Sequence, residues 1–138
     1  MIEAIHIGPE EAGDLHTVES VRALAGKGLE GDRNFFPNGA GPGQALTLVE
    51  AEEVEGAGLA PGATRRNLTV RGVRLNDLVG KHFKVGDVEC YGVELCEPCA
   101  HLQSMTRPGI LEDLLHRGGL RADVLSDGVI SVGDAITA

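Results

Sequence analysis

The sequence contains no tryptophan, and only 3% of its 138 residues are aromatic. We therefore expect a core built from Val, Leu, Ile and Ala, which supply most of the 42% hydrophobic content. No run of 18 apolar residues occurs, so we expect no transmembrane helix and no membrane partner. Residues 1–7 read directly as an alternating strand without a basic leader, which predicts a cytoplasmic protein with reduced thiols.

Basic residues are scarce in this chain. It has 12 Lys and Arg against 21 Asp and Glu, for a net charge of −9 and an isoelectric point near 4.9. A protein that binds nucleic acid needs clustered cations to neutralise phosphates. The charge balance therefore argues against a nucleic-acid partner.

Glycine, by contrast, is abundant. Twenty glycines separate short apolar runs, a pattern typical of a β-barrel with tight turns. We predict one mostly β domain over residues 1–138, with short helices at residues 50–55 and 109–116. Two-residue hairpin turns are expected at Gly86-Asp87 and Asp127-Gly128. Strands are predicted at residues 2–7, 17–24, 44–49, 67–70, 81–85, 88–94, 122–125 and 129–137.

Two of the three cysteines, Cys96 and Cys99, lie together between a predicted strand and a predicted helix. Backbone N–H groups at such a turn lower a thiol pKa, so a reactive sulfur is one hypothesis. The spacing also suits a thioredoxin-like dithiol, but no alternating strand and helix units surround it. A zinc site lacks a second ligand pair at a recognisable spacing. The remaining alternative is a pair of buried structural cysteines, and this is the role we assign to Cys90.

Arginines cluster at a few places in the sequence, although the net charge is negative. Arg33 follows Asp32, and the pair Arg65-Arg66 precedes Asn67. Guanidinium groups suit a phosphate, and an Asn amide can read the edge of a heterocycle. The alternatives are a structural pair of Arg33 with Asp32 or Glu30 and a solvated surface role for Arg65-Arg66.

Six segments of the chain, taken in order, resemble the MOSC family, the domain named after the C-terminal part of molybdenum cofactor sulfurases. The resemblance implies a MOSC-type β-barrel and a function in handling the molybdenum cofactor, a pterin that carries a dithiolene and a terminal phosphate. The segments are residues 28–34 (GLEGDRN), 45–49 (ALTLV), 64–70 (TRRNLTV), 78–87 (LVGKHFKVGD), 97–99 (EPC) and 128–136 (GVISVGDAI).

The resemblance also implies roles for individual residues. Cys99, the cysteine after the proline, becomes the sulfur-carrying persulfide thiol or a molybdenum ligand, with His101 near it to favour the thiolate. Cys96 departs from the family pattern, and its role stays open. The residues implied in binding the cofactor are Arg33, Arg65, Arg66, Asn67 and His101.

Three versions of the function follow from the resemblance. In the first, Cys99 accepts sulfur from a partner cysteine desulfurase; this chain carries no pyridoxal phosphate domain of its own. In the second, the cofactor reduces N-hydroxylated compounds with a redox partner protein, because the chain has no flavin or iron–sulfur motif. In the third, the chain is a carrier of cofactor or metal without turnover.

Overall fold

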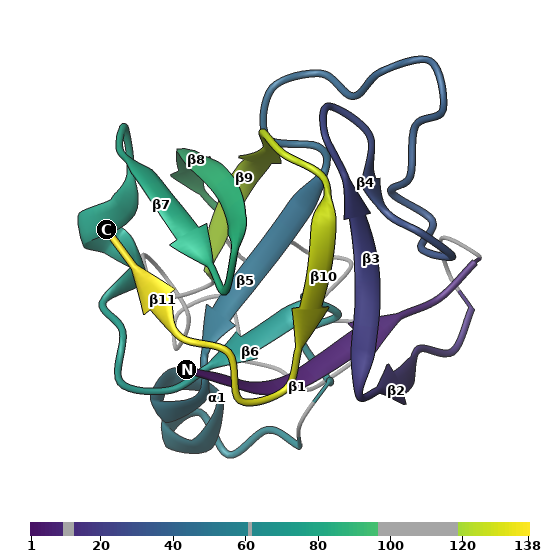
Figure 1. Ribbon diagram of the computed structural model, residues 1–138. Coiled ribbons are helices and arrows are strands. Elements are labelled where there is room, and N and C mark those ends of the chain that lie inside the picture. Colours follow the sequence, from purple (N-terminus) through teal and green to yellow (C-terminus); the bar gives the residue numbers. More distant parts are fainter. Residues whose placement is uncertain (10–12, 61, 97–118) are drawn as a thin grey trace.

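The computed structural model describes residues 1–9, 13–60, 62–96 and 119–138. Within these ranges the chain is mostly β, with one short α-helix and one 3-10 turn (Figure 1). The strands are β1 (Ile2–Ile7), β2 (His16–Val18), β3 (Ser20–Leu24), β4 (Gly28–Leu29), β5 (Leu46–Glu50), β6 (Leu68–Val70), β7 (His82–Val85), β8 (Val88–Leu95), β9 (Leu120–Val124), β10 (Gly128–Ser131) and β11 (Ile136–Thr137). The helices are α1 (Ala51–Gly56) and η1 (Leu75–Leu78).

The strands form two sheets. The larger has the order β11-β7-β8-β9-β5-β6-β1-β2 and the smaller the order β10-β3-β4. Neighbours pair antiparallel except β5 and β6, which run parallel. Figure 1 shows the large sheet curling around the core, with β3 and β10 of the small sheet across from it. The result is a half-barrel closed by a second sheet.

The core lies between the two sheets and is aliphatic, as the composition predicts. Val21 and Ile130 of the small sheet belong to the same buried cluster as Leu48 and Leu120 of the large sheet. Phe83 is the aromatic member of that cluster among the described residues. Buried and exposed positions alternate along β7, as expected for a strand with one face on the core.

Two of the predicted strands are each split in the structure. Residues 17–24 divide at Glu19, because β2 pairs with β1 in the large sheet while β3 pairs with β10 in the small one. Residues 129–137 divide near Gly133, whose N–H donates to the carbonyl of Ile2. The chain changes sheet at both places, and an alternating pattern does not reveal such a change.

One predicted hairpin is confirmed and the other is wrong. Gly86-Asp87 joins β7 to β8, with Val85 paired to Val88. Asp127-Gly128 makes no hairpin, because β9 pairs with β5 and β8 whereas β10 pairs with β3. The Asp127 carboxylate instead accepts a bond from the N–H of Ala25 at 2.7 Å, on the crossing from one sheet to the other.

Helix α1 confirms the helix predicted at residues 50–55 within one residue at each end. The helix predicted at residues 109–116 lies outside the described residues. In the part of the chain that the structure describes, no helix has the length and apolar character needed to cross a membrane.

Candidate functional site

The buried carboxylate of Asp32 binds donors from three parts of the chain, one of them just after the end of β1. The side chain of Asp32 is fully buried, and its oxygens accept four hydrogen bonds. The donors are the N–H groups of Gly8 (3.1 Å) and Asn34 (3.2 Å), Nδ2 of Asn67 (3.2 Å) and Nη1 of Arg33 (2.9 Å). A carboxylate is stable out of water only when it is paired and hydrogen-bonded in this way. Asp32 therefore fixes the loop after β4.

Arg33 links this carboxylate to the loop that contains Arg65 and Arg66, which we call the basic loop. Its Nη1 pairs with Asp32, and its Nη2 donates to the carbonyl of Arg65 at 2.9 Å. The backbone N–H of Arg33 donates to the carbonyl of Gly8 at 2.6 Å. The pairing with Asp32, one of the alternatives open from the sequence, is therefore present. The bond from Arg33 to the carbonyl of Arg65 holds together two segments that are 32 positions apart in the sequence.

Asn67 is completely buried, and its side-chain amide bonds to other protein groups. Its Oδ1 accepts bonds from N and Oγ1 of Thr47, both at 3.2 Å. Its Nδ2 donates to the carbonyl of His6 and to Asp32, both at 3.2 Å. The amide therefore joins β1 and β5 to the loop before β6 and places the arginines that precede it.

Arg65 sits at a strained point of that loop. Its φ of 60° lies in the left-handed region, which costs a residue with a side chain about 1–2 kcal/mol. Its Nη1 donates to the carbonyl of Gly13 at 2.7 Å. Burial, followed by the positive charge of Arg33, lowers the pKa of the Arg65 guanidinium. Strain and crowded positive charge together mark this position as a candidate for binding.

Arg66 points to a different part of the molecule. Its Nη1 donates to the carbonyl of Thr64 at 3.2 Å and its Nη2 to the carbonyl of Cys96 at 3.3 Å. Cys96 directly follows the end of β8 and is three positions before Cys99. The structure thus brings the basic loop against Cys96, the first cysteine of the Cys96–Cys99 pair. Cys99 and His101 themselves lie outside the described residues.

The two described cysteines are both buried and free. Cys90 lies on β8, and burial together with the negative charge of Asp123 raises its thiol pKa to about 12. Cys90 is buried, as predicted, and its structural role stays a prediction. Cys96 is 1% exposed, and its N–H donates to the carbonyl of Gly119 at 2.7 Å.

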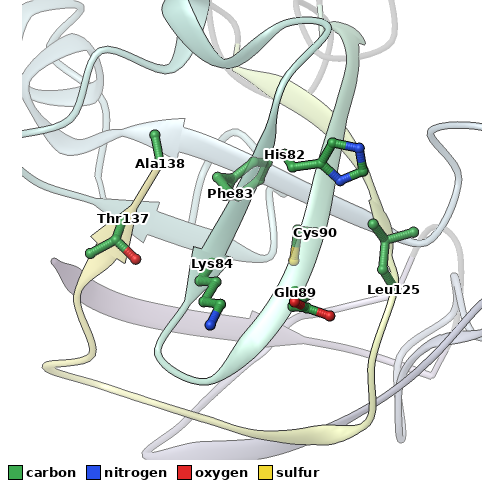
Figure 2. A pocket seen from close by; sticks show the side chains of 8 residues that line it. All are labelled: His82, Phe83, Lys84, Glu89, Cys90, Leu125, Thr137 and Ala138. Atoms are coloured by element: carbon green, nitrogen blue, oxygen red, sulfur yellow. The ribbon is translucent and has the colours of Figure 1, made fainter.

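Two cavities of similar size open on the described surface. One, of about 640 Å³, lies beside the β7–β8 hairpin, where Figure 2 shows Lys84 and Glu89 on neighbouring strands, with Cys90 next to Glu89 on β8. It contains none of the predicted site residues. The other, of about 650 Å³, includes Arg65, and we call it the β1–β2 cavity. The described residues that line it are His6, Asp14, Leu15, His16, Thr17, Gly62, Ala63 and Arg65.

The donor set in the described ranges does not suggest a bound metal ion. No group of three or more His, Cys, Asp or Glu side chains there is placed to hold one. Among the described residues, the candidate site consists of the Asp32 network, the β1–β2 cavity and the contact of Arg66 with Cys96.

Comparison with known proteins places this arrangement in a family. The family model of the MOSC domain matches residues 4–137. The chain belongs to the MOSC family. This MOSC chain also shares its fold with solved structures, and the predicted mostly β MOSC-type fold with short helices is confirmed.

The structural neighbours of this MOSC chain are distant in sequence. YuaD from Bacillus subtilis is 18% identical with a TM-score of 0.76, over 98% of this chain and 92% of that one. YiiM from Escherichia coli is 18% identical with a TM-score of 0.69, over 99% and 68%. YiiM from Geobacillus stearothermophilus is 20% identical with a TM-score of 0.68, over 99% and 73%. No curated protein matches the chain in sequence.

Sequence reasoning does not single out two residues of this MOSC site. Asp32 belongs to a segment that carries the family resemblance, but the sequence presents its carboxylate only as a partner of Arg33. His6 lies in an alternating strand, and a lone histidine there carries no pattern of its own. Two of the four donors around Asp32, Arg33 and Asn34, are its neighbours in sequence, whereas Gly8 and Asn67 lie 24 and 35 positions away, so only the fold reveals those two.

Proposed function

We propose that this MOSC protein binds the molybdenum cofactor and uses Cys99 as a sulfur-carrying thiol or as a molybdenum ligand. The observation that supports the proposal best is the bond from Arg66 to the carbonyl of Cys96. It fastens a cationic loop to the backbone that leads into Cys99. In this proposal the Cys99 thiol is the sulfur ligand or carrier, and Arg65 on the same loop provides a positive charge for the phosphate.

The described residues fit such a cofactor. Arg65 supplies a positive charge on the wall of a cavity whose volume lies in the range of small-molecule sites, about 300–1,000 Å³. In this proposal Arg65 binds the phosphate, Arg66 holds its loop against the backbone of Cys96, and Arg33 and Asn67 position that loop through Asp32. When bound, the cofactor supplies the redox and sulfur-ligand chemistry of molybdenum. The chain itself supplies binding and orientation.

In the sulfur-carrying version, the Cys99 thiolate attacks the outer sulfur of a persulfide on a cysteine desulfurase. A new S–S bond forms on Cys99, the S–S bond of the donor breaks, and the donor cysteine leaves as a thiolate with the electron pair. No external oxidant or reductant is needed. Ionisation of Cys99 near neutral pH is the requirement, and a guanidinium beside the thiol would favour it.

The test is elemental analysis of protein expressed in a host that makes the molybdenum cofactor. We expect molybdenum or labile sulfur in stoichiometric amount in the wild type, loss in Cys99→Ser, and retention in the matched variant Cys96→Ser. Molybdenum identifies a cofactor-bound form, for which reduction of N-hydroxylated compounds is then assayed. Labile sulfur without molybdenum identifies sulfur transfer. Full loading of Cys99→Ser, or zinc alone, contradicts the role given to Cys99.

A second measurement follows the thiols directly. A free cysteine ionises near pH 8.5 and an assisted thiolate lower, so Cys99 should be alkylated first, at about pH 6–7. Cys90 is an internal control, because its pKa of about 12 keeps it unreactive until the chain unfolds. Mass mapping identifies the order of labelling. Cys96 reacting ahead of Cys99 would show that the assignment is wrong.

A further inference from the structure

Residues 97–118, which we call the Cys99 segment, leave the described fold at Cys96 and return to it at Gly119. These two residues are bonded to each other, because the N–H of Cys96 donates to the carbonyl of Gly119 at 2.7 Å. The next residues inward, Leu95 and Leu120, pair across β8 and β9. Both ends of the Cys99 segment are therefore fixed at one point of the large sheet, which we call the junction.

Gly119 lies at the junction where a side chain does not fit. Its φ is +116°, in the region that favours glycine. A Cβ atom added there would lie 2.0 Å from the carbonyl oxygen of Leu48 on β5 and 3.1 Å from its carbonyl carbon. Strand β5 is held on both sides, by β9 and β6, and Figure 1 shows β9 between β8 and β5. A larger residue at position 119 must therefore push the junction away from β5.

Arg66 holds the other side of the junction. Its Nη1 donates to the carbonyl of Thr64 at 3.2 Å and its Nη2 to the carbonyl of Cys96 at 3.3 Å. A planar guanidinium can span two carbonyls in this way, whereas a lysine ammonium is a point charge without that geometry. The backbone of Cys96 is thus bonded through both its N–H and its carbonyl, and the residue is 1% exposed. Its place in the fold is that of an anchor.

Chain connectivity links this anchor to the Cys99 thiol. Three residues of extended chain span at most about 10 Å, so the Cα of Cys99 lies within that distance of the Cα of Cys96. A misplacement of reacting groups by about 1 Å can lower a rate about 100-fold. The chain passes a displacement of Cys96 on to Cys99 within three residues, so the bonds at the junction bear directly on the thiol.

We propose that Gly119 and Arg66 are positioning residues for the Cys99 thiol, and that Cys96 is their backbone anchor and not a second reactive sulfur. The inference rests on the proposed function, in which Cys99 is the reactive thiol. It goes further by adding Gly119 and by giving Cys96 a role that the sequence leaves open. It requires neither molybdenum nor a sulfur donor, so alkylation of the free thiol tests it.

The experiment follows alkylation of Cys99 by iodoacetamide against pH, with mass mapping, in the reduced chain from a host that does not make the molybdenum cofactor. A positioned thiolate has its midpoint at about pH 6–7, and a free cysteine at about pH 8.5. We expect Gly119→Ala and Arg66→Lys each to raise the midpoint by about one pH unit, toward that of a free cysteine. Cys96→Ala keeps both backbone bonds, so its midpoint should match that of the wild type.

Gly92→Ala is the matched control for Gly119→Ala. Its Cβ would also lie 2.0 Å from a carbonyl oxygen, that of Leu78, but beside η1 and not at the junction. It should lose stability and keep the wild-type midpoint, which separates positioning from a general loss of packing. Arg22→Lys is the control for Arg66→Lys, because Arg22 is an exposed arginine on β3. If Gly119→Ala does not fold, the two arginine variants decide alone.

A wild-type midpoint at about pH 8.5 would overturn the inference, because the thiol would then behave as an unassisted cysteine. An unchanged midpoint in either Gly119→Ala or Arg66→Lys would overturn the role given to that residue, as would an equal rise in its control. Labelling of Cys96 in the folded wild type would contradict its role as an anchor. The two proposals fail separately. Shifted midpoints without molybdenum or sulfur loading refute the proposed function alone, and loading without shifted midpoints refutes the positioning alone.

Discussion

The Asp32 carboxylate is the residue on which the polar network depends most. Asp32→Asn keeps the shape but places an NH₂ group among donors and leaves the partly buried Arg33 without its counter-charge. Breaking a buried pair by removing one partner typically costs about 3–5 kcal/mol. We therefore expect a drop of that size in the free energy of unfolding, measured by urea denaturation.

The matched control for Asp32 is Glu30→Gln. Glu30 pairs with Arg22 at 3.9 Å, and both side chains are about half exposed or more. Exposed pairs contribute about 0–1 kcal/mol, so this variant should unfold almost like the wild type. Equal effects of the two substitutions would show that Asp32 is not a structural centre.

At the scale of single residues, the sequence singles out side chains by their chemistry but does not reveal their hydrogen-bond partners. Arg33 and Asn67 stand out by their side-chain chemistry and by the family resemblance. Their hydrogen-bond partners lie on strands that only the fold brings together, such as Thr47 on β5. The identity of a side chain limits what it can bond. The three-dimensional arrangement decides which of those bonds form, and so Asn67 acts on its neighbours inside the protein.

Among the secondary-structure elements, β8 depends on a glycine that the η1 turn covers. The Cβ of an alanine at Gly92 would lie 2.0 Å from the carbonyl oxygen of Leu78. The carbonyl of Gly92 accepts a bond from the N–H of Gly80 at 2.8 Å, and the N–H of Gly92 donates to the carbonyl of Lys81 at 3.0 Å. Gly92→Ala must therefore displace η1 from β8, and we expect a loss of about 3 kcal/mol in stability, measured by urea denaturation.

Gly56 provides the control for Gly92, because it ends α1 and a Cβ added there would have no described atom within 4 Å outside its chain neighbours and the backbone of its own helix. Alanine has the higher helix propensity by about 0.8–1 kcal/mol, so Gly56→Ala should leave stability unchanged or raise it. A Gly92→Ala protein as stable as this control would mean that η1 does not pack against β8 as described.

Strand positions are predictable where apolar and polar residues alternate because one face covers the core. The predictions fail where the chain leaves one sheet for the other, at Glu19 and at Asp127. Both places contain ordinary polar residues, and the Asp127-Gly128 pair carries a turn signal that also suits a hairpin. Local propensity does not distinguish a turn that returns to the same sheet from a crossing to another.

For the whole molecule, His6 links stability to pH. Burial lowers the pKa of His6 below its usual 6.5. As the pH falls below 6.5 toward the folded-state pKa, the unfolded chain binds a proton that the folded chain does not, so stability is lost over that window. Well above pH 6.5, His6 is neutral in both the folded and the unfolded chain and does not make stability depend on pH.

The test measures unfolding free energy against pH between about 5 and 7.5, where one histidine gives a slope of at most about 1.4 kcal/mol per pH unit. The slope should flatten in His6→Phe. It should persist in His82→Gln, which alters an exposed histidine on β7. An unchanged profile in His6→Phe would exclude His6 as the source.

The pairing of β3 with β10 has a consequence for folding during synthesis on the ribosome. The small sheet joins residues 20–24 to residues 128–131, and the bond from Ala25 to Asp127 spans 102 positions. During synthesis β3 therefore lacks its partner strand β10 until residues 128–131 have been made. Until then the side chains of Val21 and Ala23, which face the core, are not covered by that strand. Closing so long a loop is slow. The nascent chain is thus most exposed to aggregation and proteolysis just before its last strands emerge.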